Sequence, residues 1–243
     1  MGKLKEKVAI ITGGANGMGE THSRLFVEES AKVVITDIDT EKGEQLAEEL
    51  GKNAIFIKHD VSSEEDWKNV VEKATTTFGN IDILVNNAGI RPVSTLETMT
   101  LKEYKHVVNI NQISVFLGMK SVLPSMKKVE HGSIINISSI NGLVAGAFCY
   151  TDTKFAVRGM TKVAAKELAT YGIRVNSVHP GIIDTPMVQT SEAHDEIMGR
   201  VKLVPLQRMA KPEEISHLVL FLASEESSYC TGSEFVADGG ITI

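Results

Sequence analysis

Short apolar runs rich in Val and Ile alternate with longer amphipathic stretches along nearly the whole chain. Most of these runs are apolar at almost every position, which is typical of strands in a parallel sheet covered on both faces. We expect strands within seven segments: 7–12, 32–37, 53–60, 81–87, 132–138, 173–179 and 233–240. Helices are expected near 18–30, 41–51, 63–78, 101–128, 150–170 and 212–224.

Strict alternation of strand and helix favours a doubly wound fold. The sequence therefore predicts an α/β protein with one domain over residues 1–243. Its core is expected to be a Rossmann-type, doubly wound parallel sheet of about seven strands with helices on both faces. Only 185–211, a long polar stretch, breaks the alternation. Because such an insertion in a compact domain is usually functional or mobile, we expect a substrate loop there.

Composition and charge narrow the range of partners. The chain of 243 residues is 42% hydrophobic and 23% charged, as expected of an ordinary folded protein. Its net charge of -6 argues against nucleic acid or an anionic membrane as the main partner, since both attract clustered Lys and Arg. The first apolar run is too short for a signal peptide or membrane span.

The chain contains only two cysteines, Cys149 and Cys230, and seven scattered histidines. Neither residue type shows the paired spacing of a disulfide framework or a metal site. We therefore expect no catalytic metal, and a reducing cytoplasm is the location that fits best.

A glycine-rich segment, "TGGANGMG" at 12–19, follows the first predicted strand and opens the first predicted helix. Glycine lets the backbone turn tightly there, so that a pyrophosphate can approach the N–H groups of the helix N-terminus. The spacing of Gly13, Gly17 and Gly19 differs from the usual dinucleotide pattern. Taken alone, the segment fits either a nucleotide loop or a plain strand-to-helix turn.

Asp37 ends the second predicted strand and supports the nucleotide interpretation. A carboxylate at this position accepts hydrogen bonds from the adenosine ribose hydroxyls and repels a 2′-phosphate. No Arg or Lys lies within the glycine segment or directly after Asp37 to bind such a phosphate. The cofactor predicted is therefore NAD rather than NADP, although a strand-end Asp in isolation is more often a turn residue.

Ordered motifs over essentially the whole length resemble the short-chain dehydrogenase/reductase family of the single-domain type. They are "TGGANGMG", "NNAG" at 86–89, "NIN" at 109–111, "NISS" at 136–139, Tyr150-x-x-x-Lys154, "RVNSVHPG" at 174–181, "DTPM" at 184–187 and "DGG" at 238–240. Within the family, the segments around 64–71, 116–127 and 174–187 are most similar to bacterial hydroxysteroid and cyclic secondary alcohol dehydrogenases.

The resemblance implies a catalytic set of Asn111, Ser139, Tyr150 and Lys154. A phenol with a pKa of about 10 becomes a useful general base or acid only when nearby positive charge stabilises its anion. Lys154, one helical turn from Tyr150, would supply such a charge, and a serine hydroxyl would hold the substrate oxygen. Asn111 is expected to bend its helix and help hold a water that connects Lys154 to solvent.

The same resemblance implies the contacts to the cofactor. The residues expected to bind it are Gly13, Asn16, Gly17, Met18, Gly19, Asp37, Asp60, Val61, Asn87, Ala88, Gly89, Tyr150, Lys154, Pro180, Gly181, Ile183 and Thr185.

The segment before Tyr150 departs from the family pattern. Ser139 stands eleven residues before Tyr150 and Ser138 stands twelve before it, so this loop is two residues shorter than in most relatives. Successive strand side chains point to opposite faces, so only one of the two serines can face the substrate. Alignment on "NISS" favours Ser139, and Ser138 remains the alternative.

These motifs favour an NAD-dependent dehydrogenase that interconverts a secondary alcohol, cyclic or bulky, with its ketone. Two alternatives stay open: a 3-oxoacyl-[acyl carrier protein] reductase, and a non-catalytic regulator that senses a dinucleotide. The family resemblance also implies a homo-oligomer, commonly a tetramer built through the helices near 101–128 and 150–170 and the last strand.

Overall fold

The computed structural model describes residues 2–243, and its sheet contains the seven strands that the sequence predicts. These are β1 (Val8–Thr12), β2 (Lys32–Asp37), β3 (Ala54–Lys58), β4 (Ile83–Asn86), β5 (Gly132–Ile137), β6 (Ile173–Pro180) and β7 (Glu234–Ala237). Neighbouring strands are all parallel, in the order β3-β2-β1-β4-β5-β6-β7. The α/β, doubly wound prediction is confirmed.

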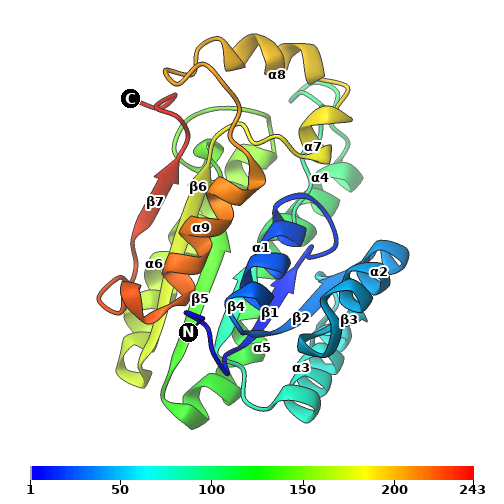
Figure 1. Ribbon diagram of the computed structural model, residues 1–243. Coiled ribbons are helices and arrows are strands. Elements are labelled where there is room, and N and C mark those ends of the chain that lie inside the picture. Colours follow the sequence, from blue (N-terminus) through cyan, green and yellow to red (C-terminus); the bar gives the residue numbers. More distant parts are fainter. Residues whose placement is uncertain (1) are drawn as a thin grey trace.

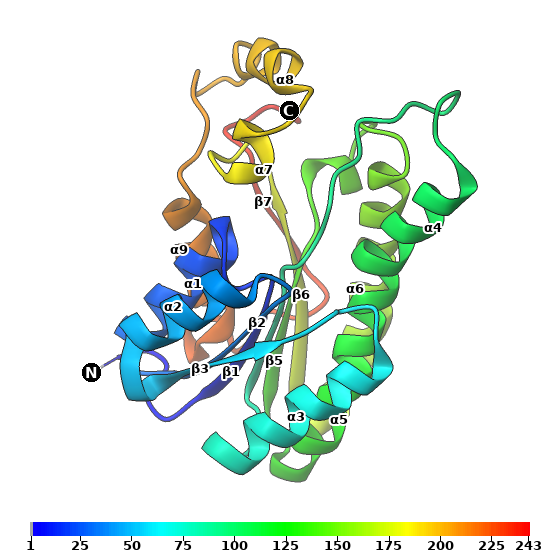
Figure 2. The ribbon, with the colours of Figure 1, turned by 90° about the vertical axis from the view of Figure 1, so that its right-hand side faces the viewer.

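Helices cover both faces of this sheet (Figure 1). They are α1 (Gly17–Glu28), α2 (Thr40–Leu50), α3 (Glu64–Phe78), α4 (Leu101–Val108), α5 (Ser114–Val129), α6 (Tyr150–Leu168), α7 (Pro186–Gln189), α8 (His194–Val201) and α9 (Pro212–Ala223). Figure 2 shows α1, α2 and α9 on one side of the sheet and α3, α5 and α6 on the other.

The alternation of side chains along β1 shows why both faces need covering. All five positions of this strand are buried. Ala9 and Ile11 join a core cluster with Phe26 of α1, whereas Ile10 joins a second cluster with Trp67 of α3. The strand is apolar throughout because each face of the sheet contributes to a separate hydrophobic core.

The connection after β1 places β2 on one side of it, while β4 lies on the other side. In an open parallel sheet, ligands bind outside the carboxyl ends of the strands where the strand order reverses in this way. The glycine segment after β1 and the "NNAG" segment after β4 therefore meet at one crevice.

The single helix predicted over 101–128 is divided in the structure. The α-helices α4 and α5 are separated by a π-helical segment, Asn109–Ile113, with Asn111 buried inside it. The Asn111 side chain accepts from the backbone N–H of Ile90 and donates to the carbonyl of Ile90, both at 2.8 Å. This paired contact fastens the irregular turn to the chain that follows β4, and sequence periodicity does not reveal it.

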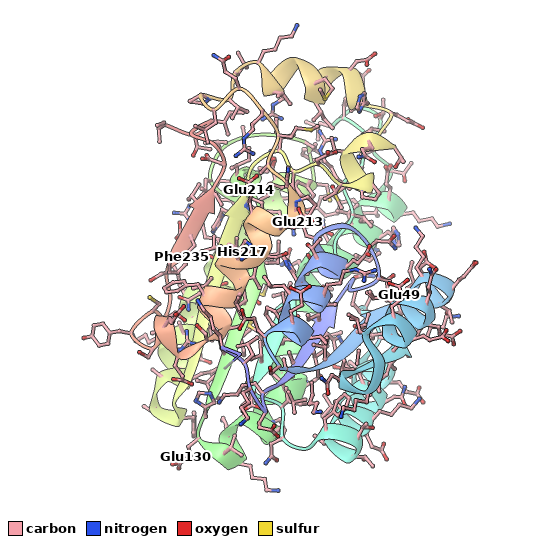
Figure 3. The ribbon with its side chains drawn as sticks, in the orientation of Figure 1. Glu49, Glu130, Glu213, Glu214, His217 and Phe235 are labelled. Atoms are coloured by element: carbon pink, nitrogen blue, oxygen red, sulfur yellow. The ribbon has the colours of Figure 1, made fainter. Side chains whose placement is uncertain are left out.

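The insertion predicted at 185–211 contains the short helices α7 and α8, which lie above the carboxyl ends of the strands in Figure 1. Its far end is anchored to α9, because Arg208 Nη1 and Nη2 each donate to the Glu214 carboxylate at 2.7 Å. Figure 3 shows Glu214 in the first turn of α9. This ion pair lowers the pKa of Glu214 to about 2. Whether the segment binds substrate stays a prediction.

Three properties of the described chain bear on its chemistry. Within residues 2–243, no group of three or more His, Cys, Asp or Glu side chains is arranged to hold a metal ion. Over the same residues, no helix is both long enough and apolar enough to cross a bilayer. Cys149 and Cys230 are both free thiols.

Candidate active site

The groove outside β1, β2 and β4 is a cavity of about 300 Å³. It brings together eleven of the residues expected to bind the cofactor: Gly13, Asn16, Gly17, Met18, Asp37, Asp60, Val61, Asn87, Ala88, Gly89 and Thr185. Ile38, His59, Ile90, Ile110, Pro186 and Met187 complete its walls.

Glycines shape the floor of this groove. Gly13 and Gly17 have φ angles of 61° and 54°, in the left-handed region that other residues rarely adopt. Gly19 does not line the cavity, but a Cβ there would stand 1.9 Å from the Gly13 carbonyl oxygen. The three glycines therefore let the loop pass close under the N-terminus of α1, and the cradle fits a pyrophosphate.

Asp37 stands at the end of β2, where its carboxylate is held by the glycine segment. Its Oδ2 accepts from the backbone N–H of Ala15 at 3.1 Å, and its Oδ1 accepts from that of Asp39 at 3.0 Å. Each carboxylate oxygen keeps a further lone pair, so two neighbouring ribose hydroxyls can still donate to this group. The groove as a whole therefore fits a dinucleotide.

The structure also places one cation near Asp37 that the sequence pattern did not reveal. Lys42, in the first turn of α2, donates through Nζ to Asn16 Oδ1 at 2.8 Å. It also lies 3.8 Å from Asp39 Oδ2. Lys42 is thus neutralised by Asp39 and tied to the rim of the groove.

The segment after β4 is fixed by β1. Thr12 Oγ1 accepts from the backbone N–H groups of both Asn87 and Ala88, at 3.0 and 3.1 Å. Asn87 Nδ2 donates in turn to the carbonyls of Thr12 and Gly13, at 2.9 and 3.1 Å. The Asn87 side chain therefore braces the glycine loop as well as lining the groove.

A second cavity, of about 110 Å³, adjoins the first and shares Met18, Thr185 and Met187 with it. It contains the hydroxyl-bearing residues Ser138, Ser139 and Tyr150, together with Pro180, Gly181 and Ile183 from the expected cofactor set. We refer to it as the catalytic cavity. Asn111 and Lys154 line neither cavity and are almost completely buried behind them.

Tyr150 and Lys154 occupy the first turns of α6, one above the other. The Lys154 ammonium lies 5.4 Å from the centre of the Tyr150 ring, and Nζ donates to the carbonyl of Ile137 at 2.8 Å. Lys154 is only 3% exposed, and this burial lowers its pKa to about 8. It therefore remains mostly protonated near neutral pH.

Burial raises the pKa of the Tyr150 phenol and therefore disfavours its anion. The Ser139 hydroxyl and the positive charge of Arg91 act against this effect, although the pKa stays above its usual value. Arg91 is a cation that the sequence motifs did not assign to the site. The Tyr150 anion needs further positive charge to form at neutral pH.

The two serines at the end of β5 point to different neighbours. Ser138 Oγ donates to the backbone carbonyl of Lys154 at 3.0 Å, and its hydroxyl proton is therefore engaged by α6. Ser139 Oγ accepts from the backbone N–H of Asn141 at 3.1 Å and donates to Asn141 Oδ1 over a longer 3.5 Å. The same hydroxyl acts to lower the pKa of the Tyr150 phenol. Of these two serines, Ser139 is the one whose hydroxyl acts on the pKa of Tyr150, and its choice as the substrate-facing serine stays a prediction.

A buried histidine holds Ser139 in place. His179 Nδ1 donates to the backbone carbonyl of Ser139, and His179 Nε2 is bonded to Ser177 Oγ, both at 2.9 Å. Burial lowers the pKa of His179 and so favours the neutral ring, in which Nδ1 carries the proton and Nε2 accepts from Ser177. The "NSVHPG" segment contained this residue, but its spacing gave no sign that it reaches Ser139.

Comparison with known proteins shows which family the chain resembles over nearly its whole length. A family model described as enoyl-(acyl carrier protein) reductase matches residues 13–242. The chain is 48% identical to 3-alpha-(or 20-beta)-hydroxysteroid dehydrogenase of Mycobacterium tuberculosis over 98% of this chain and 90% of the relative. It is 43% identical to cyclopentanol dehydrogenase of Comamonas testosteroni over 100% and 99% of the two chains.

Another relative is trans-4-hydroxycyclohexanecarboxylate dehydrogenase of Sinomonas cyclohexanicum, 42% identical over 99% of this chain and 94% of the relative. Identity of 40 to 41% extends to an NADP-dependent (R)-specific alcohol dehydrogenase of Lentilactobacillus kefiri and a 3-oxoacyl-[acyl-carrier-protein] reductase of Thermotoga maritima. The chain belongs to the short-chain dehydrogenase/reductase family. It is therefore an oxidoreductase of a family that uses a nicotinamide dinucleotide as its cofactor.

Proposed function

We propose that this protein is an NAD-dependent dehydrogenase that interconverts secondary alcohols, cyclic or bulky, with their ketones. The observation that carries the proposal is the shared wall between the two cavities. The Ser139 and Tyr150 hydroxyls line a small cavity that opens beside the groove headed by Asp37. If these hydroxyls bind the oxygen of a carbonyl group, its carbon would face a dinucleotide in that groove.

Each residue has a specific part in this reaction. A nicotinamide dinucleotide, when bound, supplies the hydride acceptor or donor. Ser139 donates to the substrate oxygen and fixes its position. Tyr150 removes the hydroxyl proton during alcohol oxidation and returns it during ketone reduction. Lys154 supplies a nearby positive charge that favours the tyrosine anion.

Asp37 supports NAD over NADP. Its carboxylate would repel a 2′-phosphate, and the next residue, Ile38, is exposed and offers no charge to bind one. Lys42 is the cation closest in sequence after Asp37, and it is already bonded to Asn16 and close to Asp39. An NADP-dependent relative exists at 40% identity, so coenzyme choice rests on these residues rather than on the family.

The substrate class rests on relatives named for a hydroxysteroid, cyclopentanol and a hydroxycyclohexanecarboxylate, which are all secondary alcohols of ring-containing molecules. A 3-oxoacyl-[acyl-carrier-protein] reductase is the second candidate, because a relative with that name is 41% identical over 99% of this chain. The presence of Ser139, Tyr150, Lys154 and Asn111 in one site argues against a regulator without catalytic activity.

The test is a set of initial-rate measurements with NAD⁺ and NADP⁺ across aliphatic, cyclic, aromatic and steroid alcohols. We expect turnover with NAD⁺ and a cyclic secondary alcohol. Preference for NADP⁺ would contradict the coenzyme assignment. Reduction of acetoacetyl-coenzyme A at a higher kcat/KM than any cyclic ketone would favour the reductase candidate.

We also propose a homo-oligomer, since large apolar side chains are exposed on the surfaces that relatives of this family use for assembly. They are Ile113, Phe116, Phe155, Val163 and Val236. Association would cover these side chains and the free edge of β7. Sedimentation equilibrium is expected to give a tetramer, and a monomer at assay concentration would contradict this. The two free thiols favour a reducing compartment such as the cytoplasm.

A further inference from the structure

Two arginines stand where the substrate must enter. Arg91 follows the "NNAG" segment, and Arg200 lies in the last turn of α8. Both line the catalytic cavity, and both also line an outer cavity of about 430 Å³. They therefore stand at the boundary between the outer cavity and the hydroxyls of Ser139 and Tyr150.

Neither guanidinium has an acidic partner in the described part of the chain. Within residues 2–243, no carboxylate oxygen lies close enough to Arg91 or Arg200, at 4.0 Å or less, to form an ion pair. Arg91 Nη1 is buried and has no hydrogen-bond partner in that part of the chain. A buried N–H group without a partner costs free energy, so this atom favours a ligand that supplies an acceptor.

The charges around the arginines are uneven. The residues that line the catalytic cavity include two cations and no Asp or Glu. In the outer cavity the one carboxylate is that of Glu196, an exposed residue of α8. Neither arginine lines the dinucleotide groove, so the phosphates of a cofactor there do not account for them.

We propose that Arg91 and Arg200 form a subsite for a carboxylate carried by the substrate, so that the protein acts on cyclic hydroxy acids and oxo acids. Guanidinium groups bind carboxylates through charge-assisted, often bidentate hydrogen bonds. The subsite holds the carboxylate at the mouth of the cavity while the reacting carbon lies deeper, near Tyr150. This inference rests on the proposed dehydrogenase function and specifies its substrate class.

The test compares 4-oxocyclohexanecarboxylate with its neutral methyl ester, using NADH and the wild-type enzyme. The acid is expected to have a kcat/KM about tenfold or more above that of the ester, mainly through a lower KM. Arg91→Gln and Arg200→Gln are each expected to lower this acid-to-ester ratio about tenfold or more. Lys202→Gln, which removes an exposed cation just after α8, is the matched control and should leave the ratio unchanged.

The possible results separate the two proposals. Equal kcat/KM for acid and ester in the wild type would overturn the subsite but leave the dehydrogenase standing. Faster turnover of acetoacetyl-coenzyme A than of either compound would also overturn it. If no ketone is reduced, the dehydrogenase proposal fails, and calorimetric titration with cyclohexanecarboxylate still tests the subsite. Binding that weakens about tenfold in Arg91→Gln supports the subsite, and absence of binding to the wild type refutes it.

Discussion

The Lys154 ammonium lies 5.4 Å from the centre of the Tyr150 ring, but its hydrogen bond is made to the carbonyl of Ile137. The end of β5 therefore orients the lysine, while the tyrosine lies above it at the cavity wall. Burial changes the pKa of both groups: it lowers the pKa of Lys154 to about 8 and raises that of Tyr150. Burial thus works against the charged form of each group, and the cation and the phenolate are expected to stabilise each other.

Replacing Lys154 by Met tests this dependence. Loss of a cation at this distance is expected to raise the apparent pKa of Tyr150 by about 1 to 3 units. The pH profile of kcat/KM for alcohol oxidation should therefore move to higher pH, with a lower rate at neutral pH. An unchanged profile would show that Lys154 does not act on the phenol.

The two serines are separated by single substitutions. Ser139→Ala is expected to lower kcat by about 10²-fold, because it removes a hydrogen bond to the reacting oxygen. Ser138→Ala should instead cost about 1 kcal/mol of unfolding free energy through the lost bond to the Lys154 carbonyl. Steady-state rates and urea unfolding of both variants provide the measurement. The reverse pattern would identify Ser138 as the serine that faces the substrate.

Asp37→Ser tests the coenzyme assignment. The substitution removes a charged acceptor for the ribose hydroxyls and the repulsion of a 2′-phosphate, so the ratio of kcat/KM for NADH over NADPH should fall about 100-fold. Glu41→Gln removes an exposed carboxylate from α2 nearby and serves as the control for net charge. A ratio that changes equally in both variants would point to long-range charge alone.

The buried His22 is expected to make the free energy of unfolding depend on pH. It is buried in α1 beside Ser216, and burial lowers its pKa to about 3. In the unfolded chain His22 binds a proton near pH 6.5, whereas in the folded chain it stays neutral until the pH is much lower. The free energy of unfolding therefore falls as the pH decreases below 6.5. The loss from this group is about 2 kcal/mol at pH 5.

Urea unfolding at pH 7, 6 and 5 measures that dependence. In His22→Gln the stability should fall less steeply with acid than in the wild type. His217 projects from the exposed face of α9 (Figure 3), and His217→Gln is the matched control. Equal slopes for His22→Gln and the wild type would contradict the assignment.

Features that depend on local spacing could be predicted from the sequence. The seven strands follow from apolar runs, and the glycine loop and the Tyr150–Lys154 pair follow from short motifs. Contacts between distant segments could not be predicted in this way. His179 reaches Ser139, and Arg91 meets Arg200 at one opening, only because the sheet and α8 bring them together.

The divided helix shows the same limit. The periodicity of 101–128 is that of one helix, and only the family resemblance suggested a bend at Asn111. The π-helical turn coincides with a paired contact between Asn111 and the backbone of Ile90, which belongs to another segment.

Tyr150→Phe tests the central claim most directly, because it removes one hydroxyl and keeps the ring. We expect kcat for oxidation of a cyclic secondary alcohol to fall about 10²- to 10⁴-fold, because the variant lacks the general base. The Kd for NADH, measured by fluorescence titration, should change less than about twofold, which is well under the tenfold that 1.4 kcal/mol represents. Turnover that persists at the wild-type rate would contradict the assignment of Tyr150 and the mechanism built on it.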